Sequence, residues 1–251
     1  MDQRKKDILA YLKKNESVKI SALAEMCNVS QVTIRKDITQ LEEQGLIVRY
    51  HGRISIVNAE TTPYFIREDA NCAQKRLVAR EALKLIRPSD TIILDAGTTT
   101  MAIAEEMIHL PPRNIVTNSI PIATQLRNTN HTITMSGGVL LNRSMCTVGP
   151  DAEAFFNKIE ADKVFLGCYG LRENQGLTTN IILEASVKRA MLHAAKEVIA
   201  VFDGSKFSQT ALEMFAGFEE IDKVITTHPL EETPVLKELE QRGIQVIFAD
   251  D

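Results

Sequence analysis

The stretch LDAGTTT, residues 94–100, begins with Leu94, the last residue of an apolar run that starts at Ile92. It is followed by MAIAEEM, whose apolar residues have helical spacing. The local order is therefore strand, glycine turn, helix. Such a turn directs backbone N–H groups and the positive end of a helix dipole toward one point, where an anion can bind. Taken alone, the stretch leaves two interpretations open, a phosphate-binding loop or a simple turn.

The same alternation of strands and helices continues on both sides of this stretch. Strands are predicted at 91–95, 114–117, 132–136, 162–167, 197–203, 223–226 and 244–250. Helices are predicted at 75–86, after 98, and at 120–127, 183–195 and 234–243. This order predicts an α/β domain with a largely parallel sheet covered on both faces. Ligands of such sheets bind beyond the carboxyl ends of the strands.

Polar, glycine-containing loops follow five of the predicted strands. They are DAGTTT, TNS at 117–119, SGG at 136–138, GCYG at 167–170 and DGSK at 203–206. In a parallel sheet these loops converge on one edge, where glycines allow close backbone approach, hydroxyls and amides suit a polyol, and Lys206 suits a phosphate. Each loop alone is a weak signal, so the prediction rests on their convergence.

Composition limits the classes of protein that the chain can represent. Its 251 residues are 44% hydrophobic, enough for one large domain or two smaller ones. No uncharged apolar run of about 18 residues occurs, and the charged first residues do not resemble a signal peptide, so we expect a cytoplasmic protein without a membrane partner. The four cysteines and five histidines lack metal-ligand spacing, and no P-loop or dinucleotide fingerprint occurs; we expect no metal and no cofactor.

Charge is unevenly distributed along the chain. Residues 1–55 hold ten Lys and Arg against seven Asp and Glu, an excess of +3, whereas the remainder carries −7 and the whole chain −4. Such asymmetry suggests that the amino-terminal part binds a polyanion.

The basic amino-terminal part has the pattern of three helices. The first is predicted from about Arg4 to Lys14, and a short second helix, ALAEMC, follows Ser21. The connection NVS ends at Ser30, a good helix cap, and a third helix runs from about 31 to 44 with Ile34, Ile38 and Leu41 on its buried side. Two short helices joined by a tight turn place the second one in a DNA major groove.

A wing completes this pattern. Gly45 ends the third helix, and LIVRYHGRISIV provides two strands about His51 and Gly52, with Arg49 and Arg53 placed to pair with phosphates. A three-helix unit with a basic face is also a common protein interaction module, but the wing favours DNA. The sequence therefore predicts a winged helix-turn-helix.

The stretch ISALAEMCNVSQVTIRKDITQLEEQGLIVRYHG resembles the helix-turn-helix of the DeoR family of bacterial transcriptional regulators. The resemblance implies a DNA-facing surface formed by Ser30, Gln31, Thr33, Arg35 and Lys36, and a wing formed by Arg49, His51, Gly52 and Arg53. Two positions depart from the family pattern. Lys36 replaces an arginine and loses its bidentate geometry, and Arg53 replaces a glycine of the wing turn.

Asp37 lies within the third helix, where its carboxylate would repel phosphate. Its helix neighbours three and four positions away include no basic residue, so it is not placed in the DNA-facing surface. Cys27 is expected in the core.

The larger part of the chain is similar to the effector domain of the same family, through LDAGTTT, TNS, GG, GLTT, EASVKRAM and FDGSKF in the same order. The resemblance implies a fold related to ribose-5-phosphate isomerase and a phosphorylated sugar or sugar-alcohol as effector, with the Gly-Thr-Thr turn on its phosphate. The matching positions are Asp95, Gly97, Thr98, Thr99, Thr100, Asn118, Gly137, Gly138, Glu184, Lys188 and Lys206. Thr227 stands where the family commonly has aspartate, and no ligand contact is assigned to it.

These observations predict a winged helix-turn-helix at 1–57, a linker at 58–74 and a sugar-phosphate-sensing, oligomerising α/β domain at 75–251. The predicted function is a repressor of a sugar-utilisation operon that binds double-stranded operator DNA and is not an enzyme. Because two-fold operators need two heads roughly 34–36 Å apart, a homodimer is the minimum and a tetramer is compatible. One alternative is a sugar-phosphate isomerase with an appended head, using Glu184 as base with help from Asp95 or Lys206. A pure interaction adaptor is the other, and it leaves the polar strand-end loops unexplained.

Overall fold

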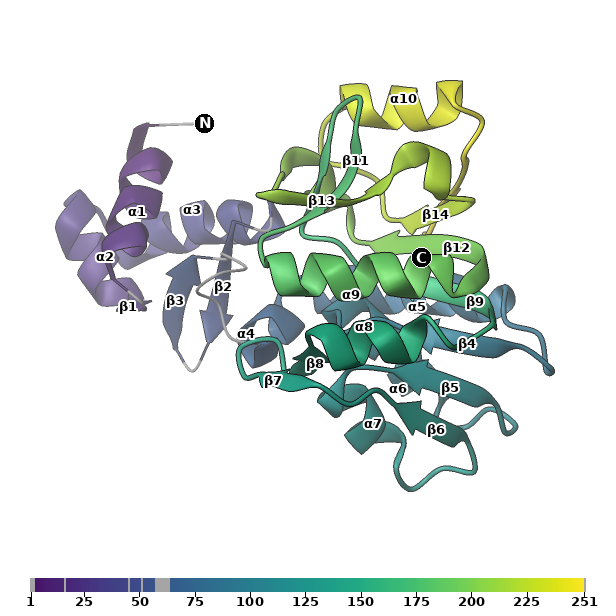
Figure 1. Ribbon diagram of the computed structural model, residues 1–251. Helices are drawn as coiled ribbons and strands as arrows, with labels where there is room; N and C mark the ends of the chain where they lie inside the picture. The colour runs from purple at the N-terminus through teal and green to yellow at the C-terminus, as the bar shows by residue number, and fades with distance from the viewer. Residues whose placement is uncertain (1–2, 16, 45, 51, 57–63, 251) are drawn as a thin grey trace. The chain divides into compact units, whose positions relative to one another are not determined.

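The computed structural model describes residues 3–15, 17–44, 46–50, 52–56 and 64–250. The chain divides into two compact units, Met1–Cys72 and Ala73–Asp251. Each unit has its own helices, strands and hydrophobic core (Figure 1).

The first unit is a winged helix-turn-helix, as predicted. Its elements are α1 (Gln3–Lys14), β1 (Val18–Lys19), α2 (Ile20–Cys27), α3 (Gln31–Glu43), β2 (Ile47–Tyr50), β3 (Arg53–Ile56) and α4 (Tyr64–Asp69). The three strands form an antiparallel sheet in the order β1-β3-β2. Ile34, Ile38 and Leu41 of α3 are fully buried with Leu23 of α2 and Ile8 of α1, which confirms the predicted apolar side of the third helix.

Two local expectations for this region differ from the structure, and a third lies outside the described residues. Ser21 lies inside α2 rather than before it, because Val18 and Lys19 pair with β3 and the helix begins directly after that strand. The expected end at Gly45 lies outside the described residues; α3 ends at Glu43 with Gln44 as its cap. Part of the segment expected to be a linker is the helix α4, whose six residues span less than two turns and give no sustained apolar period.

The second unit contains the predicted parallel sheet. Its elements are α5 (Cys72–Lys84), β4 (Thr91–Leu94), α6 (Thr98–Met107), β5 (Asn114–Thr117), α7 (Ile120–Leu126), β6 (Thr132–Met135), β7 (Val139–Leu141), β8 (Cys146–Val148), α8 (Pro150–Phe156), β9 (Ala161–Leu166), β10 (Gly170–Arg172), β11 (Gly176–Thr179), α9 (Ile182–His193), β12 (Ala195–Phe202), the 3₁₀ helix η1 (Gly204–Ser208), β13 (Glu213–Gly217), η2 (Phe218–Glu220), β14 (Lys223–Thr226), α10 (Pro234–Gln241) and β15 (Gln245–Phe248). Seven strands form the sheet in the order β15-β14-β12-β9-β4-β5-β6, and all six neighbouring pairs are parallel.

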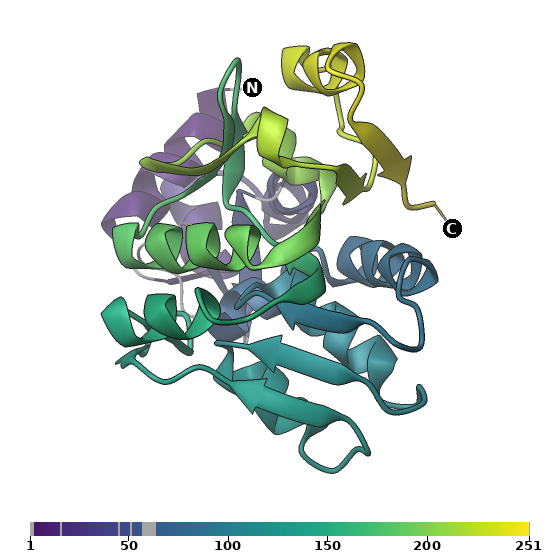
Figure 2. The ribbon, with the colours of Figure 1, turned by 45° about the vertical axis from the view of Figure 1, so that its right-hand side comes forward.

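Helices cover the sheet on both faces. Figure 1 shows α8 and α9 in front of the sheet and α5 and α6 behind it. Ile93 of β4 and Val164 of β9 lie in one apolar cluster with Met191 of α9. Figure 2, turned by 45°, shows the sheet extending from β15 at the C-terminal end to β6 at the opposite edge.

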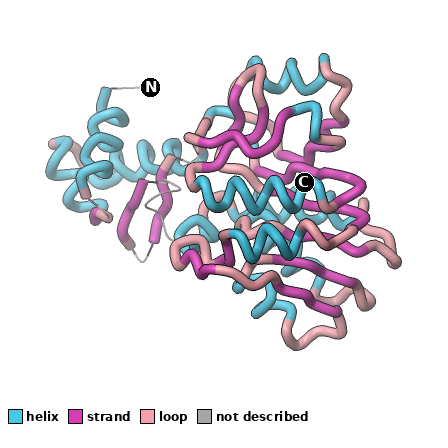
Figure 3. The backbone as a smooth tube through the Cα atoms, viewed as in Figure 1, coloured by secondary structure: helices cyan, strands magenta, loops and turns pink. Residues whose placement is uncertain are grey.

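Two smaller β structures were not predicted. Strands β10, β11 and β13 form an antiparallel sheet, and β7 pairs with β8 in a hairpin. Figure 3 shows these short strands in magenta beside the helices of the same unit. The strands are three to five residues long, so they offer too few positions for a period-two pattern. The GLTT motif, noted only through its resemblance to the family, forms β11.

The strand order reverses direction between β4 and β9. From β4 the chain adds β5 and β6 on one side, whereas β9 is followed by β12, β14 and β15 on the other. In open α/β sheets the crevice beyond such a switch point is the usual ligand position. Asp95 directly follows β4 and Gly167 directly follows β9, so both lie at this point.

Candidate nucleic-acid interface and effector site

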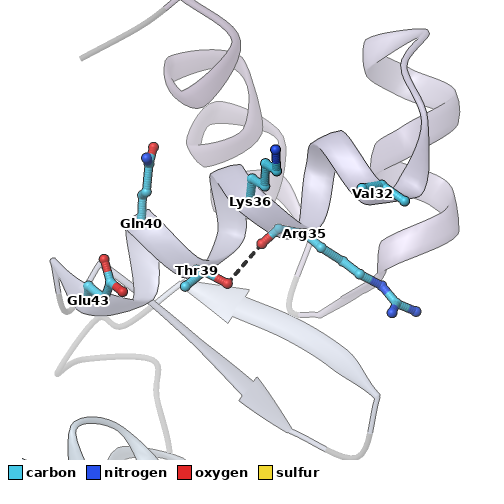
Figure 4. A pocket seen from close by; sticks show the side chains of 6 residues that line it. All are labelled: Val32, Arg35, Lys36, Thr39, Gln40 and Glu43. Atoms are coloured by element: carbon cyan, nitrogen blue, oxygen red, sulfur yellow. Dashed lines mark hydrogen bonds between the residues drawn. The ribbon is translucent and has the colours of Figure 1, made fainter.

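Helix α3 presents a polar outer face. Its residues Val32, Arg35, Lys36, Thr39, Gln40 and Glu43 line an open hollow on the side away from the core (Figure 4). Ser30 caps the helix, since its Oγ accepts a hydrogen bond from the Thr33 backbone N at 3.2 Å and lies 3.0 Å from Thr33 Oγ1. Ser30 and Thr33 therefore bind each other at the helix start, whereas Gln31, Arg35 and Lys36 are exposed.

The two wing arginines bind within the first unit. Arg49 Nη2 donates to Thr39 Oγ1 at 2.6 Å, and Arg49 Nε lies 3.0 Å from Glu42 Oε2. Arg53 donates to Ser17 Oγ at 2.7 Å and to the Ser17 carbonyl at 2.6 Å. These contacts hold the strands of the wing against α3 and the β1 end, so in this structure neither guanidinium is directed only outward.

The wing turn itself is only partly described. Gly52 has a φ of +72°, a left-handed conformation that suits glycine. His51, predicted as part of the wing, lies outside the described residues.

The sequence analysis did not find the partner of Asp37. Its carboxylate is buried and accepts from Arg4 Nε at 2.5 Å and from Arg4 Nη2 at 3.1 Å. The partner comes from α1, 33 positions earlier in the chain. The available signal was position, because Asp37 follows Ile34 by three residues and precedes Leu41 by four, on the buried side of α3.

In the second unit, the switch point holds a buried ion pair. Lys188 Nζ of α9 bonds to Asp95 Oδ2 and donates to the Gly167 carbonyl at 2.9 Å. Asp95 Oδ2 also accepts from the Gly167 backbone N at 3.1 Å. The structure therefore brings two predicted ligand residues, Asp95 and Lys188, together with Gly167, which was noted only as part of a strand-end loop.

The Gly-Thr-Thr turn is closed by its own side chains. Thr100 Oγ1 accepts a hydrogen bond from the Gly97 backbone N–H at 2.9 Å and donates one to the Asp95 carbonyl at 2.6 Å. Thr99 and Thr100 are buried, whereas Gly97 and Thr98 are half-buried at the start of α6. The first N–H groups of a helix have no partner inside it, so the turn offers donors toward the switch point.

Asn118 provides an unpaired acceptor on the next strand end. Its Nδ2 donates to the Thr147 carbonyl at 2.9 Å, and within the described residues its buried Oδ1 has no hydrogen-bond partner. A buried acceptor of this kind is costly unless a donor such as a hydroxyl group meets it.

The Gly137–Gly138 pair has a structural role at its second position. Gly138 has a φ of +123°, and a Cβ there would lie 2.6 Å from the carbonyl oxygen of Val148 in β8. Position 138 therefore requires glycine. Gly137 is exposed and has open space around it.

Two lysines lower the pKa of Asp203, which follows the end of β12. Burial alone would raise the pKa of Asp203, but the charges of Lys206 and Lys75 and the hydrogen bonds from Ser205 together hold it below its usual range. Lys75 of α5 is buried and was not predicted as part of the site. Its signal was weak, since one lysine in an otherwise ordinary helix pattern resembles a surface residue.

Lys206, Glu184 and Cys168 have partners or neighbours of their own in this part of the sensor unit. Lys206 Nζ lies 5.6 Å from the centre of the Tyr169 ring. Glu184, one turn before Lys188 on α9, accepts from Thr179 Oγ1 at 3.1 Å. Burial raises the pKa of the Cys168 thiol to about 12, so it stays neutral near pH 7 although Lys206 and Lys188 lie close.

Thr227 holds the loop that carries Lys206. Its Oγ1 accepts from the Gly204 backbone N at 2.9 Å. The departure from aspartate therefore keeps a hydrogen-bond acceptor at this position.

Other classes of site are not seen in the described part of the chain. There, no group of three His, Cys, Asp or Glu side chains could hold a metal ion. No helix among these residues is both long and apolar enough to span a bilayer.

A helix-turn-helix joined to an α/β unit with polar groups at its switch point defines a DNA-binding regulator with a sensor domain. Residues 4–60 match the model of the DeoR-like helix-turn-helix domain, and residues 70–228 match that of the DeoR C terminal sensor domain. The chain belongs to the DeoR family of helix-turn-helix transcriptional regulators.

Individual relatives are similar over nearly the whole chain. The HTH-type transcriptional regulator GlpR of Haloferax volcanii is 34% identical over 248 residues, which cover 98% of this chain and 96% of the relative. The glycerol-3-phosphate regulon repressor of Escherichia coli is 30% identical and covers 90% and 91%. Among solved structures, ribose 5-phosphate isomerase A of Methanocaldococcus jannaschii matches 55% of each chain at 18% identity with a TM-score of 0.41.

Proposed function

We propose that this regulator represses a sugar-utilisation operon and leaves its operator when a phosphorylated sugar or sugar-alcohol binds the sensor domain. In this proposal residues 1–57 form the DNA-binding head, 58–74 connect it, and 75–251 sense the effector and assemble the oligomer. The name of the Escherichia coli relative, a glycerol-3-phosphate regulon repressor, supports this class of effector.

Operator binding is assigned to the first unit. Its proposed contacts are Ser30, Gln31, Thr33, Arg35, Lys36, Arg49, His51, Gly52 and Arg53. The exposed basic pair Arg35 and Lys36 on the outer face of α3 supports this assignment most directly. Arg49 and Arg53 would reach phosphates only by sharing or leaving their present partners.

One observation carries the effector class: groups that suit a sugar phosphate gather at the carboxyl edge of the sheet. The start of α6, Lys206 and the unpaired Asn118 Oδ1 follow strands at this edge, and Lys188 borders the switch point. N–H groups and lysines suit a phosphate, and a buried amide oxygen suits a hydroxyl group. The proposed ligand residues are Asp95, Gly97, Thr98, Thr99, Thr100, Asn118, Gly137, Gly138, Glu184, Lys188 and Lys206. Of these, Thr100 and Gly138 act through the backbone shape that they maintain.

Release requires that the effector prefer one of two states. A ligand with equal affinity for the DNA-binding and the released states shifts nothing. In a homodimer or tetramer, the spacing of two heads must match half-sites about one DNA turn apart. An effector that changes the subunit arrangement would therefore release the operator.

We propose that the site binds its effector without turnover. Lys188 is paired with Asp95, and the Glu184 carboxylate accepts a hydrogen bond from Thr179. The names of the relatives, which are those of regulators and repressors, support binding without turnover. The protein would act in the cytoplasm, where operator DNA and phosphorylated sugars occur together.

The test is fluorescence anisotropy with DNA from upstream of the neighbouring genes, at fixed salt, with a panel of sugar phosphates and their unphosphorylated parents. We expect specific binding that one phosphorylated compound abolishes and its parent does not. Lys206→Met should bind the same DNA but respond only at much higher effector concentration, whereas Lys84→Met, at an exposed helix position, should behave as wild type. Absence of specific DNA binding in every condition would contradict the proposal, and turnover of a pentose phosphate would support the isomerase alternative.

A further inference from the structure

Val32 is an exposed apolar residue on a helix otherwise polar on that side. It is the second residue of α3, and 66% of its surface is accessible. A single exposed valine is common in proteins, so exposure alone identifies nothing. Its place on the helix is the informative feature.

The helical period sets Val32 at the centre of the outer face. Lys36 and Thr39 follow it by four and seven positions and share its row, and the buried Ile34 and Ile38 lie on the opposite side. Figure 4 shows Val32 and Arg35 together on the helix surface that lines the hollow.

Charge separates the two halves of this face. The first half carries Arg35 and Lys36, whereas the last turn carries Glu42 and Glu43. Because acidic side chains repel phosphates, the first half is the part that enters a major groove. Val32 then lies among the residues nearest to the base edges.

The chemistry of the groove determines what Val32 can recognise. Its side chain has no hydrogen-bonding atom, and the apolar group that a base pair presents in the major groove is the C5 methyl of thymine. We propose that Val32 packs on a thymine methyl in each operator half-site and thereby selects that base pair, while Arg35 and Lys36 supply polar contacts beside it. This inference rests on the proposed operator binding and deepens it.

Replacing thymine by deoxyuridine removes only this methyl group. An operator is first selected from random duplexes with the full-length protein, and each thymine of the half-site is then replaced in turn. At one position the wild-type Kd should rise roughly fourfold, the value of one buried methyl group. With Val32→Ala the two duplexes should bind almost equally at that position.

Two controls separate this contact from general effects. Val139→Ala changes a valine of the sensor unit with the same 66% exposure and should keep the fourfold difference. The dependence of Kd on salt should be the same for wild type and Val32→Ala, because no phosphate contact is removed.

Either of two results overturns the inference: a wild-type scan without any sensitive thymine, or a scan in which every thymine that is sensitive in wild type stays sensitive in Val32→Ala. Both presuppose that a specific operator was selected, so they are distinct from failure of operator binding itself.

Discussion

The two units use their charged residues in opposite ways. On α3 of the first unit, Arg35 and Lys36 are exposed, and no described side chain pairs with them. At the switch point of the second unit, Lys188 is buried against Asp95, and Lys206 lies near Asp203. The proposed DNA-facing surface is thus open to a partner and subject to screening by salt, whereas the proposed effector site is held together by its own charges.

This difference implies different costs of binding. In the proposed complex, DNA would replace water and counterions around Arg35 and Lys36, so little inside the head would have to change. In the proposed complex, an effector phosphate would share Lys188 or Lys206 with internal carboxylates, so its binding would be linked to a rearrangement inside the sensor unit. Such linkage is what a ligand-controlled switch needs.

The largest effect is expected from Asp95→Ala. This change leaves the Lys188 ammonium buried without its carboxylate, which typically costs about 3–5 kcal/mol. In calorimetry the transition of the second unit should fall by roughly 10 °C while that of the first unit stays in place.

Glu81→Ala serves as the control for Asp95→Ala, because its partner Lys84 is exposed and such pairs contribute less than about 1 kcal/mol. Equal shifts in the two variants would mean that burial gives the Asp95–Lys188 pair no special weight.

The next effect is on DNA binding. Replacing Arg35 and Lys36 together by alanine should weaken operator affinity by about 100-fold or more, equal to about 2.7 kcal/mol, and should reduce its salt dependence. Because both side chains are exposed, the melting temperatures of the two units should remain those of wild type. A variant that keeps its operator affinity would place the DNA contact elsewhere on the head.

Asp37→Ala tests the buried charge within the head. Arg4 loses both hydrogen bonds, but its side chain is 33% exposed and can regain water, so we expect a loss of about 2 kcal/mol in the first unit. Hydrogen exchange of the α3 amides should accelerate, while the second unit is unaffected. Exchange that accelerates in neither unit would show that Asp37 contributes no net stability.

Much of the fold could be predicted because its longer elements carry strong periodic patterns. Ile34, Ile38 and Leu41 identified the buried side of α3, and alternation of apolar runs with amphipathic segments predicted the parallel strands. Strands β7, β8, β10 and β11 are too short to carry that signal. Their pairing is decided by tertiary contacts instead.

The site was predictable by residue type but not by pairing. The strand-end loops predicted which residues meet at the sheet edge, yet the order of strands decides that β4 and β9 are neighbours and that Asp95 reaches Gly167 and Lys188. In the same way, Asp37 and Arg4 are 33 positions apart, and only the packing of α1 on the rest of the head joins them. The assignment of these groups to an effector stays a prediction.

The smallest effect near neutral pH concerns Asp203. Burial opposes its ionisation, but Lys206, Lys75 and Ser205 leave its pKa below the usual value, so the folded state binds the proton less tightly than the unfolded chain. The stability from this carboxylate is therefore complete above about pH 4 and is lost as pH falls further. In Asp203→Asn, the melting temperature of the second unit should fall less steeply between about pH 4 and 3 than in wild type, and the two slopes should be equal between about pH 6 and 8. Lys206→Met should also flatten the acid decline, because removal of a neighbouring positive charge raises the folded-state pKa of Asp203 toward that of the unfolded chain. Parallel curves for all three proteins would mean that Asp203 is not coupled to these lysines, and the contrast between an open head and a self-paired sensor would then rest on Asp95 and Lys188 alone.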